Sequence, residues 1–217
     1  KFLLDNGADP ATAMNMSIQQ NNFQLVDMMI SNGLATNISI DYFQKAVDAR
    51  RFDIAKKMLD IGNLDANKTL DYSIAKNAPD LIQASMEKGG DAQKVLQYAI
   101  ANRKPDLAAT AITNHGANAN AVLDDAVKSN QADLVSLMLD NQADPNLALT
   151  SALNNKKINL VPMIISKGAK VTNEQMVKVG ATGDNALVKN LIDAGGDKNA
   201  ALSGAMSGGK YQTAELI

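Results

Sequence analysis

The chain has 217 residues with 21 basic and 23 acidic side chains, so its formal charge of −2 gives no electrostatic basis for binding nucleic acid or an anionic membrane. Hydrophobic residues make up 46% of the sequence, which is enough for a buried core, and no apolar run is long enough to span a membrane. Cysteine is absent, which excludes disulfide bonds and thiolate chemistry and favours the cytoplasm or another reducing compartment.

The sequence repeats itself about every 27 residues, and a glycine marks the register. Such a period is typical of arrays of small units that contact only their neighbours and together form an extended surface. We therefore expect a single array of about eight units over residues 1–217, and a recognition surface in place of a closed catalytic pocket. The marker positions are Gly7, Gly33, Gly62, Gly89, Gly116, Gln142 in place of glycine, Gly168 and Gly195.

Each unit contains two segments whose apolar residues share one face of a helix, so each is expected to be two short antiparallel helices. In chain order, the first helices carry Phe43, Ala46 and Val47; Leu70, Ser73 and Ile74; Leu96, Ala99 and Ile100; residues 121–128; and Leu149, Ala152 and Leu153. The second helices carry Leu25, Val26, Met29 and Ile30; Ile54, Ala55, Met58 and Leu59; Leu81, Ile82, Ser85 and Met86; Leu134, Val135, Met138 and Leu139; Leu160, Val161, Ile164 and Ile165; and Leu187, Val188, Leu191 and Ile192.

Capping residues are expected at both helices of a unit. The marker glycine can take positive φ at no steric cost, and the aspartate or asparagine after it can cap the next first helix. A further polar side chain follows the turn between the two helices, and we expect it to cap the second helix. These second-helix caps are Asp53, Asp80, Asp106, Asp133 and Asn159.

One position of the first helix is small in seven units, and a small side chain lets two helices approach closely. We interpret this position as the contact between repeats. Its residues are Ser17, Ala46, Ser73, Ala99, Ala126, Ala152 and Ala205. The seventh unit differs because Val179 stands there with Gly180 beside it, so that helix is expected to be distorted or shorter.

The end of each unit resembles the end of an ankyrin repeat, as in Leu3-Leu4-Asp5-Asn6-Gly7-Ala8-Asp9-Pro10 and Asp140-Asn141-Gln142-Ala143-Asp144-Pro145. The resemblance occurs once per unit and fits the helix–helix–loop order. The T-P-L-H motif of the family is missing from every unit, and the period falls short of the family's period of about 33 residues. The difference is about the size of the β-hairpin finger, so the resemblance implies a degenerate ankyrin-like array without fingers.

Two tyrosines in consecutive repeats are the best candidates for partner contacts. Tyr72 and Tyr98 both lie two residues after the first buried leucine of a first helix, which places them on its outward side. Exposed tyrosine is favoured at protein interfaces, although isolated surface aromatic residues are also common. Lys45, Asp125 and Ser151 continue the column.

Three further features are expected to carry no chemistry. The lone His115 ends a second helix, where it can interact with the helix dipole. Residues 204–211 nearly match a phosphate-binding loop, but Tyr211 replaces the metal-binding hydroxyl and no strand is expected before it. Basic pairs such as Arg50-Arg51 recur at the turns between helices, where neighbouring aspartates largely neutralise them.

These observations predict a protein-binding scaffold that holds a partner along the first helices, with no enzymatic activity, cofactor, metal, nucleic acid or membrane. The alternative is a structural component that packs through its terminal repeats. Phe2, Leu3 and Leu4 at one end, and Leu216-Ile217 at the other, are expected to expose apolar surface. The chain is therefore expected to be a segment of a longer array or to be capped by another subunit.

Overall fold

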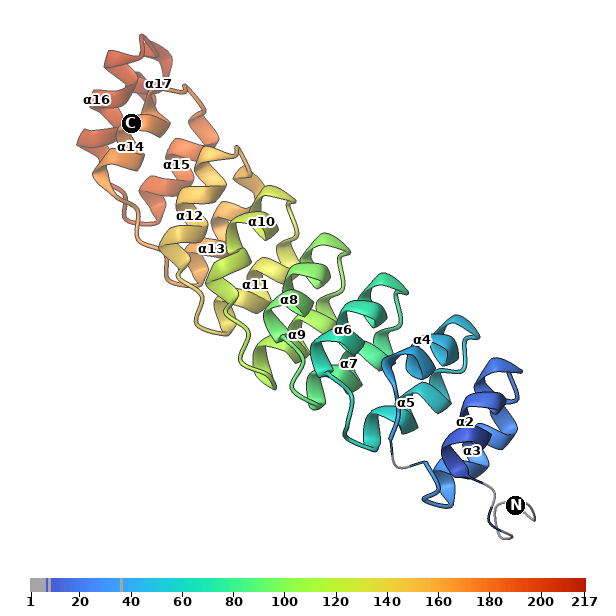
Figure 1. Cartoon of the computed structure of the whole chain (residues 1–217). Coiled ribbons are helices and arrows are strands. Elements are labelled where there is room, and N and C mark those ends of the chain that lie inside the picture. Colours follow the sequence, from blue (N-terminus) through green and yellow to red (C-terminus); the bar gives the residue numbers. More distant parts are fainter. Residues whose placement is uncertain (1–6, 8, 36) are drawn as a thin grey trace. The chain divides into compact units, whose positions relative to one another are not determined.

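The computed structural model describes residues 7, 9–35 and 37–217, and in these residues the chain is helical without a β-strand (Figure 1). The prediction of an all-α solenoid of helix–turn–helix repeats is confirmed. Phe2, Leu3 and Leu4, which were predicted to expose apolar surface, lie outside the described residues. By their contacts the residues form two compact units, Lys1–Tyr98 with Asn114–Gly116 (unit 1) and Ala99–Thr113 with Ala117–Ile217 (unit 2).

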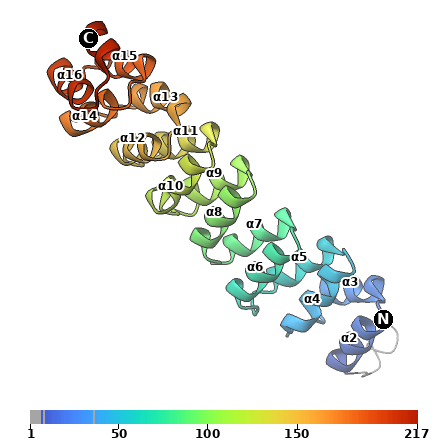
Figure 2. The ribbon, with the colours of Figure 1, turned by 90° about the horizontal axis from the view of Figure 1, so that it is seen from above.

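Unit 1 is a stack of helical hairpins in two rows. The first helices α2, α4 and α6 contact one another in order, and so do the second helices α3, α5 and α7 (Figure 2). Between the rows lie fully buried side chains such as Ile18, Met29, Phe43, Ile54 and Met58. The helices are α2 (Pro10–Gln19), α3 (Phe23–Ser31), α4 (Ile40–Asp48), α5 (Phe52–Asp60), α6 (Ala66–Ala75), α7 (Pro79–Glu87) and α8 (Ala92–Ala101), within which the boundary to unit 2 falls.

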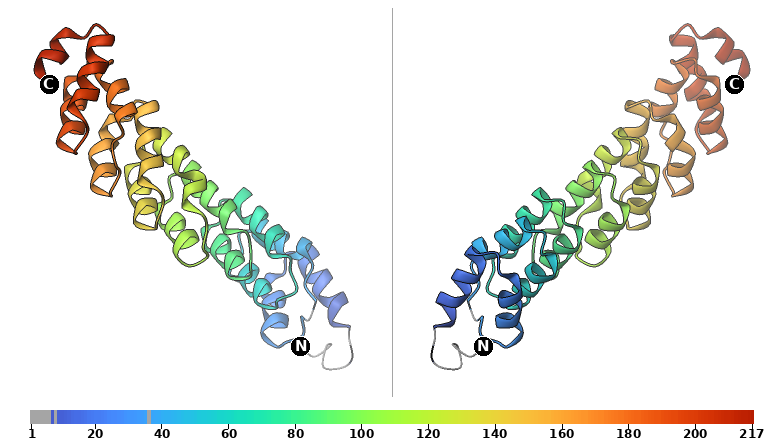
Figure 3. Two further views of the ribbon diagram at one scale, coloured as in Figure 1. Left: turned by 90° about the vertical axis from the view of Figure 1, so that its left-hand side faces the viewer. Right: turned by 90° about the vertical axis from the view of Figure 1, so that its right-hand side faces the viewer.

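Unit 2 continues the same pattern. First helices α10 and α12 contact each other, α14 contacts α16, and the second helices α9, α11 and α13 pack in order (Figure 3). Its core includes Val135, Met138, Leu149, Ile164 and Leu191, which are fully buried. The helices are α9 (Pro105–Thr113), the 3-10 turn η1 (Ala119–Val122) leading into α10 (Leu123–Lys128), α11 (Ala132–Asp140), α12 (Pro145–Asn154), the turn η2 (Ile158–Leu160) leading into α13 (Val161–Ser166), α14 (Asn173–Gly180), α15 (Asn185–Asp193), α16 (Lys198–Ser207) and α17 (Tyr211–Leu216).

The small position of the first helices lies inside the stack, as predicted. All seven residues predicted for this position are 2% exposed or less: Ser17, Ala46, Ser73, Ala99, Ala126, Ala152 and Ala205. The two serines satisfy their buried hydroxyl groups within their own helices, by donating to the carbonyl oxygens of Ala13 and Thr69 at 2.7 Å. A buried polar atom thus finds a partner without widening the contact.

Close packing of two helices explains the glycine of the seventh unit, Gly180. A Cβ atom added to Gly180 would lie 2.1 Å from the carbonyl oxygen of Ala201, and one added to Gly204 would lie 2.0 Å from that of Val177. Only glycine therefore allows α14 and α16 to approach as closely as they do. α14 has eight residues and ends at Gly180, so it is shorter than the ten-residue α12 and α16, as predicted.

The turns after the second helices follow the predicted chemistry. Every marker glycine has positive φ, and Gln142 adopts the same conformation with φ of 68°. The side chain that follows caps the next first helix: Asp9, Asp65, Asp144 and Asp197 each accept backbone hydrogen bonds there, and Ser39 and Thr172 do so in their units.

The predicted caps of the second helices are wrong. Asp53, Asp80, Asp106 and Asp133 each lie at the second helical position, and Asn159 lies inside η2. The helices begin earlier because the preceding turn is shorter than the polar stretch in the sequence. The aspartates stabilise the first turn through the positive end of the helix dipole instead.

The shorter turn depends on a left-handed residue that the sequence analysis did not identify. Where the two helices of a hairpin meet, one residue has φ between 51° and 57° although it is not glycine, while Gly183 and Gly209 take the position in the last two units. The non-glycine residues are Asn21, Arg50, Asn77, Arg103, Asn130 and Lys156.

In three hairpins an asparagine binds the loop of the next hairpin. Asn67 accepts a hydrogen bond from the backbone N–H of Asp91 at 2.9 Å. Asn120 and Asn146 accept in the same way from Asp144 and Lys170, both at 2.8 Å. Each asparagine is the second residue after a capping Asp or Asn, so the register of one hairpin sets the position of the next loop.

The left-handed conformation of Gln142 leads to a prediction about the free energy of unfolding. Gln142→Gly should raise the free energy of unfolding by about 0.5–1 kcal/mol, because relief of left-handed strain outweighs the added freedom of the unfolded chain. Gly116→Gln, at the same φ of 68° and with open space around its Cα, should lower it by a similar amount. Urea unfolding midpoints of the two variants that move in the same direction would contradict this account.

The close approach of α14 and α16 makes a second prediction. Gly204→Ala should lower the free energy of unfolding by about 1–3 kcal/mol or more, because its methyl group has no room against the backbone of Val177. Ser203→Ala, at the exposed neighbouring position, is the control and should change stability by less than about 0.5 kcal/mol. Equal melting temperatures for the two variants, measured by circular dichroism, would show that the helices are further apart.

Candidate functional site

The predicted column of partner-contacting residues lies on the first helices but is not uniformly exposed. Lys45 on α4 and Asp125 on α10 are exposed, whereas Tyr72 on α6 and Tyr98 on α8 are half-buried. Ser151 on α12 is 8% exposed, so the expectation that it faces outward is corrected. Side chains at this position point partly toward the preceding first helix. That helix therefore covers a short side chain such as that of Ser151.

Tyr72 is held by the preceding hairpin. Its phenol O–H donates to the carboxylate of Asp48, with oxygen–oxygen distances of 2.8 and 2.9 Å. Lys76 forms an ion pair with the same carboxylate at 2.8 Å, and its ammonium lies 5.3 Å from the centre of the Tyr72 ring. The hydrogen bond from Lys76, followed by that from Tyr72, lowers the pKa of Asp48. Burial and then the Asp48 carboxylate raise the pKa of Tyr72.

Tyr98 and Ser151 also direct their hydroxyl groups into the fold. The Tyr98 hydroxyl lies 2.5 Å from the side-chain oxygen of Asn77, and the Ser151 hydroxyl donates to Asp124 at 2.5 Å. Three of the five predicted residues therefore bind the preceding hairpin with their polar atoms. Sequence spacing placed these residues on one column, but it could not reveal partners that lie 21 to 27 residues earlier.

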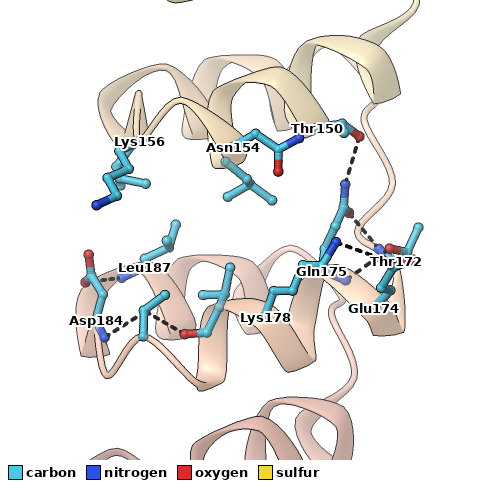
Figure 4. Close-up of a pocket in the computed structure, with 13 residues that line it drawn as sticks. Thr150, Asn154, Lys156, Thr172, Glu174, Gln175, Lys178, Asp184 and Leu187 are labelled. Carbon is cyan, nitrogen blue, oxygen red and sulfur yellow. Dashed lines mark hydrogen bonds and ion pairs between the residues drawn. The ribbon is translucent and has the colours of Figure 1, made fainter. Parts of the chain in front are cut away.

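A groove with a volume of about 740 Å³ lies on the same face, between α12 and α14 (Figure 4). Its apolar lining comes from Leu153, Ile158, Val179 and Leu187. Because the glycine contact draws α14 close to α16, we attribute the wider space on the opposite side of α14 to this unequal spacing. The remaining lining residues are polar: Thr150, Asn154, Lys156, Thr172, Glu174, Gln175, Lys178, Thr182 and Asp184.

One end of the groove is closed by side-chain contacts. Gln175 donates from its amide to the Thr150 hydroxyl at 3.2 Å, and it completes a capping box with Thr172 at the start of α14 (Figure 4). At the other end, Lys156 and Asp184 stand on opposite sides of the opening. The groove is thus a trough with an apolar lining, one closed end and one charged end.

A smaller groove of about 360 Å³ occupies the corresponding place between α4 and α6. Tyr72 contributes to its wall, together with Ile40, Gln44 and Ala75. In the larger groove, Lys178 holds the position in its helix that Tyr72 holds in α6. The predicted column therefore borders grooves between first helices in both units, a relation that the sequence pattern did not show.

The other sequence features take the expected structural places. His115 is half-buried after α9, directly before the positive-φ Gly116. Residues 204–211 run from α16 through a turn into α17 with no preceding strand, and Gly204 is a packing glycine. In the first basic pair, Arg51 forms an ion pair with Asp53 at 2.9 Å.

Comparison with known proteins gives no family assignment: no protein-family model and no curated protein matches the chain. In the described part of the chain, no group of three or more His, Cys, Asp or Glu side chains is arranged to hold a metal ion. None of the described helices has the length and apolar character needed to cross a membrane.

The contact between Tyr72 and Asp48 can be tested by mutation and pH. Tyr72→Phe should lower the free energy of unfolding by about 0.5–1.5 kcal/mol at neutral pH, because it removes a hydrogen bond between hairpins. Since the pKa of Asp48 is lowered in the folded state, its contribution is present above the usual value of 3.8 and is lost as the pH falls through the folded-state pKa.

The control for this test is Tyr72→Phe in an Asp48→Asn background. There the loss of the hydroxyl should cost clearly less at neutral pH, and the excess cost of the single variant should vanish in acid. A cost that is equal in both backgrounds at every pH would show that the hydroxyl acts independently of Asp48.

Proposed function

We propose that this chain is a protein-interaction scaffold of ankyrin-like repeats that binds a macromolecular partner along the face of its first helices. The observation that carries the proposal is the groove between α12 and α14, which combines an apolar lining with a polar rim on that face. Binding sites are typically concave, largely apolar and fitted with a few polar groups that orient the ligand. No catalytic role is included in the proposal.

The smaller groove beside Tyr72 supports the same face in unit 1. The ring of Tyr72 is half-buried and fixed by Asp48 and Lys76, so a partner could bury its remaining surface at little cost in side-chain entropy. Because its hydroxyl is already bound, Tyr72 would act through its ring. Tyr98 and the exposed Lys45 and Asp125 remain predicted contacts on this face.

Photo-crosslinking can test which face binds. A photoreactive amino acid would be placed at Lys45 or Lys178 on first helices, or at Lys56 or Lys189 on second helices, all of which are exposed. In extract from the source organism, we expect one discrete crosslinked protein from the first-helix positions and none from the second-helix controls. Crosslinking confined to the second helices would refute the proposal.

One observation favours the second candidate function, packing through a terminal repeat. Leu202 and Met206 on α16 are 37% and 53% exposed, whereas the equivalent Leu149 and Val127 of earlier first helices are 0% exposed. Tyr211 and Leu216 on α17 are exposed as well. This apolar face has the composition of an interface between stacked repeats. Association that depends on protein concentration and is abolished by Met206→Ser would support packing through this repeat.

A further inference from the structure

Most polar groups of the groove between α12 and α14 already have partners within the fold. Glu174 and Lys178 form an ion pair at 2.7 Å. Asp184 accepts a hydrogen bond from the backbone N–H of Leu187 at 3.0 Å and caps α15, where the helix dipole favours its negative charge. Gln175 is bound to Thr150 and Thr172. These groups shape the groove, and the negative charge of Asp184 is partly offset by the dipole of α15.

Two polar side chains of the lining remain without a hydrogen-bond or ion-pair partner among the described residues: Asn154 and Lys156. Both are exposed, and both come from the end of α12 and the turn that follows it. Figure 4 shows Asn154 above the middle of the groove and Lys156 at its charged end. Lys156 is therefore the cation of this lining that has no ion-pair partner among the described residues.

We propose that the groove binds an extended segment of a partner protein that carries an aliphatic side chain followed by an acidic residue. This inference rests on the proposed function and specifies the partner for one part of the first-helix face. The aliphatic side chain lies against Leu153, Val179 and Leu187, and the carboxylate pairs with Lys156. Asn154 binds the segment's backbone between these two points.

The chemistry of each group supports this occupant. The Asn154 amide offers a donor and an acceptor together, which matches the single N–H and C=O of a peptide group. In an extended segment alternate side chains point to opposite sides, so one can enter the apolar lining while the backbone stays at the rim. A basic residue is less favoured because Glu174 already pairs with Lys178, and Asp184 already accepts a backbone hydrogen bond at the start of α15, where the helix dipole stabilises its charge.

Peptide display on the complete 217-residue chain can test this proposal. The probe is a library of random twelve-residue peptides, selected in parallel on the wild-type chain and on the Lys156→Glu variant. We expect the wild type to enrich peptides with an aliphatic residue and a nearby Asp or Glu. We expect Lys156→Glu to enrich peptides with Lys or Arg in place of the acidic residue, because the charge at the end of the groove is reversed.

The control variant is Lys157→Glu, which makes the same charge change one residue further on, at a half-buried side chain outside the groove lining. For the best wild-type peptide, fluorescence anisotropy should show about three- to tenfold weaker binding to Lys156→Glu and to Asn154→Ala. Binding to Lys157→Glu should change less than about twofold. A peptide whose acidic residue is replaced by lysine should regain affinity on Lys156→Glu.

Failure of this inference is distinguishable from failure of the proposed function. If no peptide is enriched, or if Lys156→Glu and Lys157→Glu weaken binding equally, the acidic-segment assignment is overturned. The photo-crosslinking experiment does not depend on that result, because it reports contact of any protein with the first helices. Circular dichroism of each variant shows whether a loss of binding reflects loss of folding.

Discussion

The close approach of successive first helices is the constraint on which the other features depend. Seven first helices present an alanine or a serine to a neighbouring helix, and these residues are 2% exposed or less, whereas α14 has Val179 at this position. This spacing brings side chains of one hairpin within hydrogen-bond distance of the next, as in the contact of Tyr72 with Asp48. Where glycine stands beside this position, as Gly180 does in α14 and Gly204 in α16, the two helices approach more closely, and the groove of about 740 Å³ borders α14 on its other side.

Polar contacts between hairpins contribute more to fixing the alignment of one hairpin with the next than to the free energy of unfolding. The ion pair of Lys76 with Asp48 and that of Lys94 with Asp71 join exposed groups, and solvent screening leaves such pairs little net contribution to stability. The asparagines at the start of the first helices are more specific, because each one binds a single backbone N–H of the following loop. Most of the stability comes from the apolar rows, in which a fully buried large side chain contributes about 1.5–3 kcal/mol.

Periodic features could be predicted from the sequence, and features that depend on unequal spacing could not. The marker glycines, the small column and the first-helix caps repeat in nearly every unit, with Gln142 and Val179 as exceptions, so a single register reveals them. Asp133 was misplaced because capping and first-turn aspartates look alike in a sequence, and the left-handed Asn130 before it carries no glycine signal. The groove could not be predicted, because it follows from contacts of Gly180 and Gly204 that lie in separate repeats.

The hydrogen bonds between hairpins have a consequence for how the chain acquires its structure. The side-chain bonds described above that join different hairpins span only 21 to 27 residues of sequence. Closing such short loops costs little entropy, and proteins dominated by local contacts fold quickly. A nascent hairpin can therefore dock as soon as the following one leaves the ribosome. Assembly of each unit then proceeds as stepwise growth from its earliest hairpins and does not wait for synthesis of the whole chain.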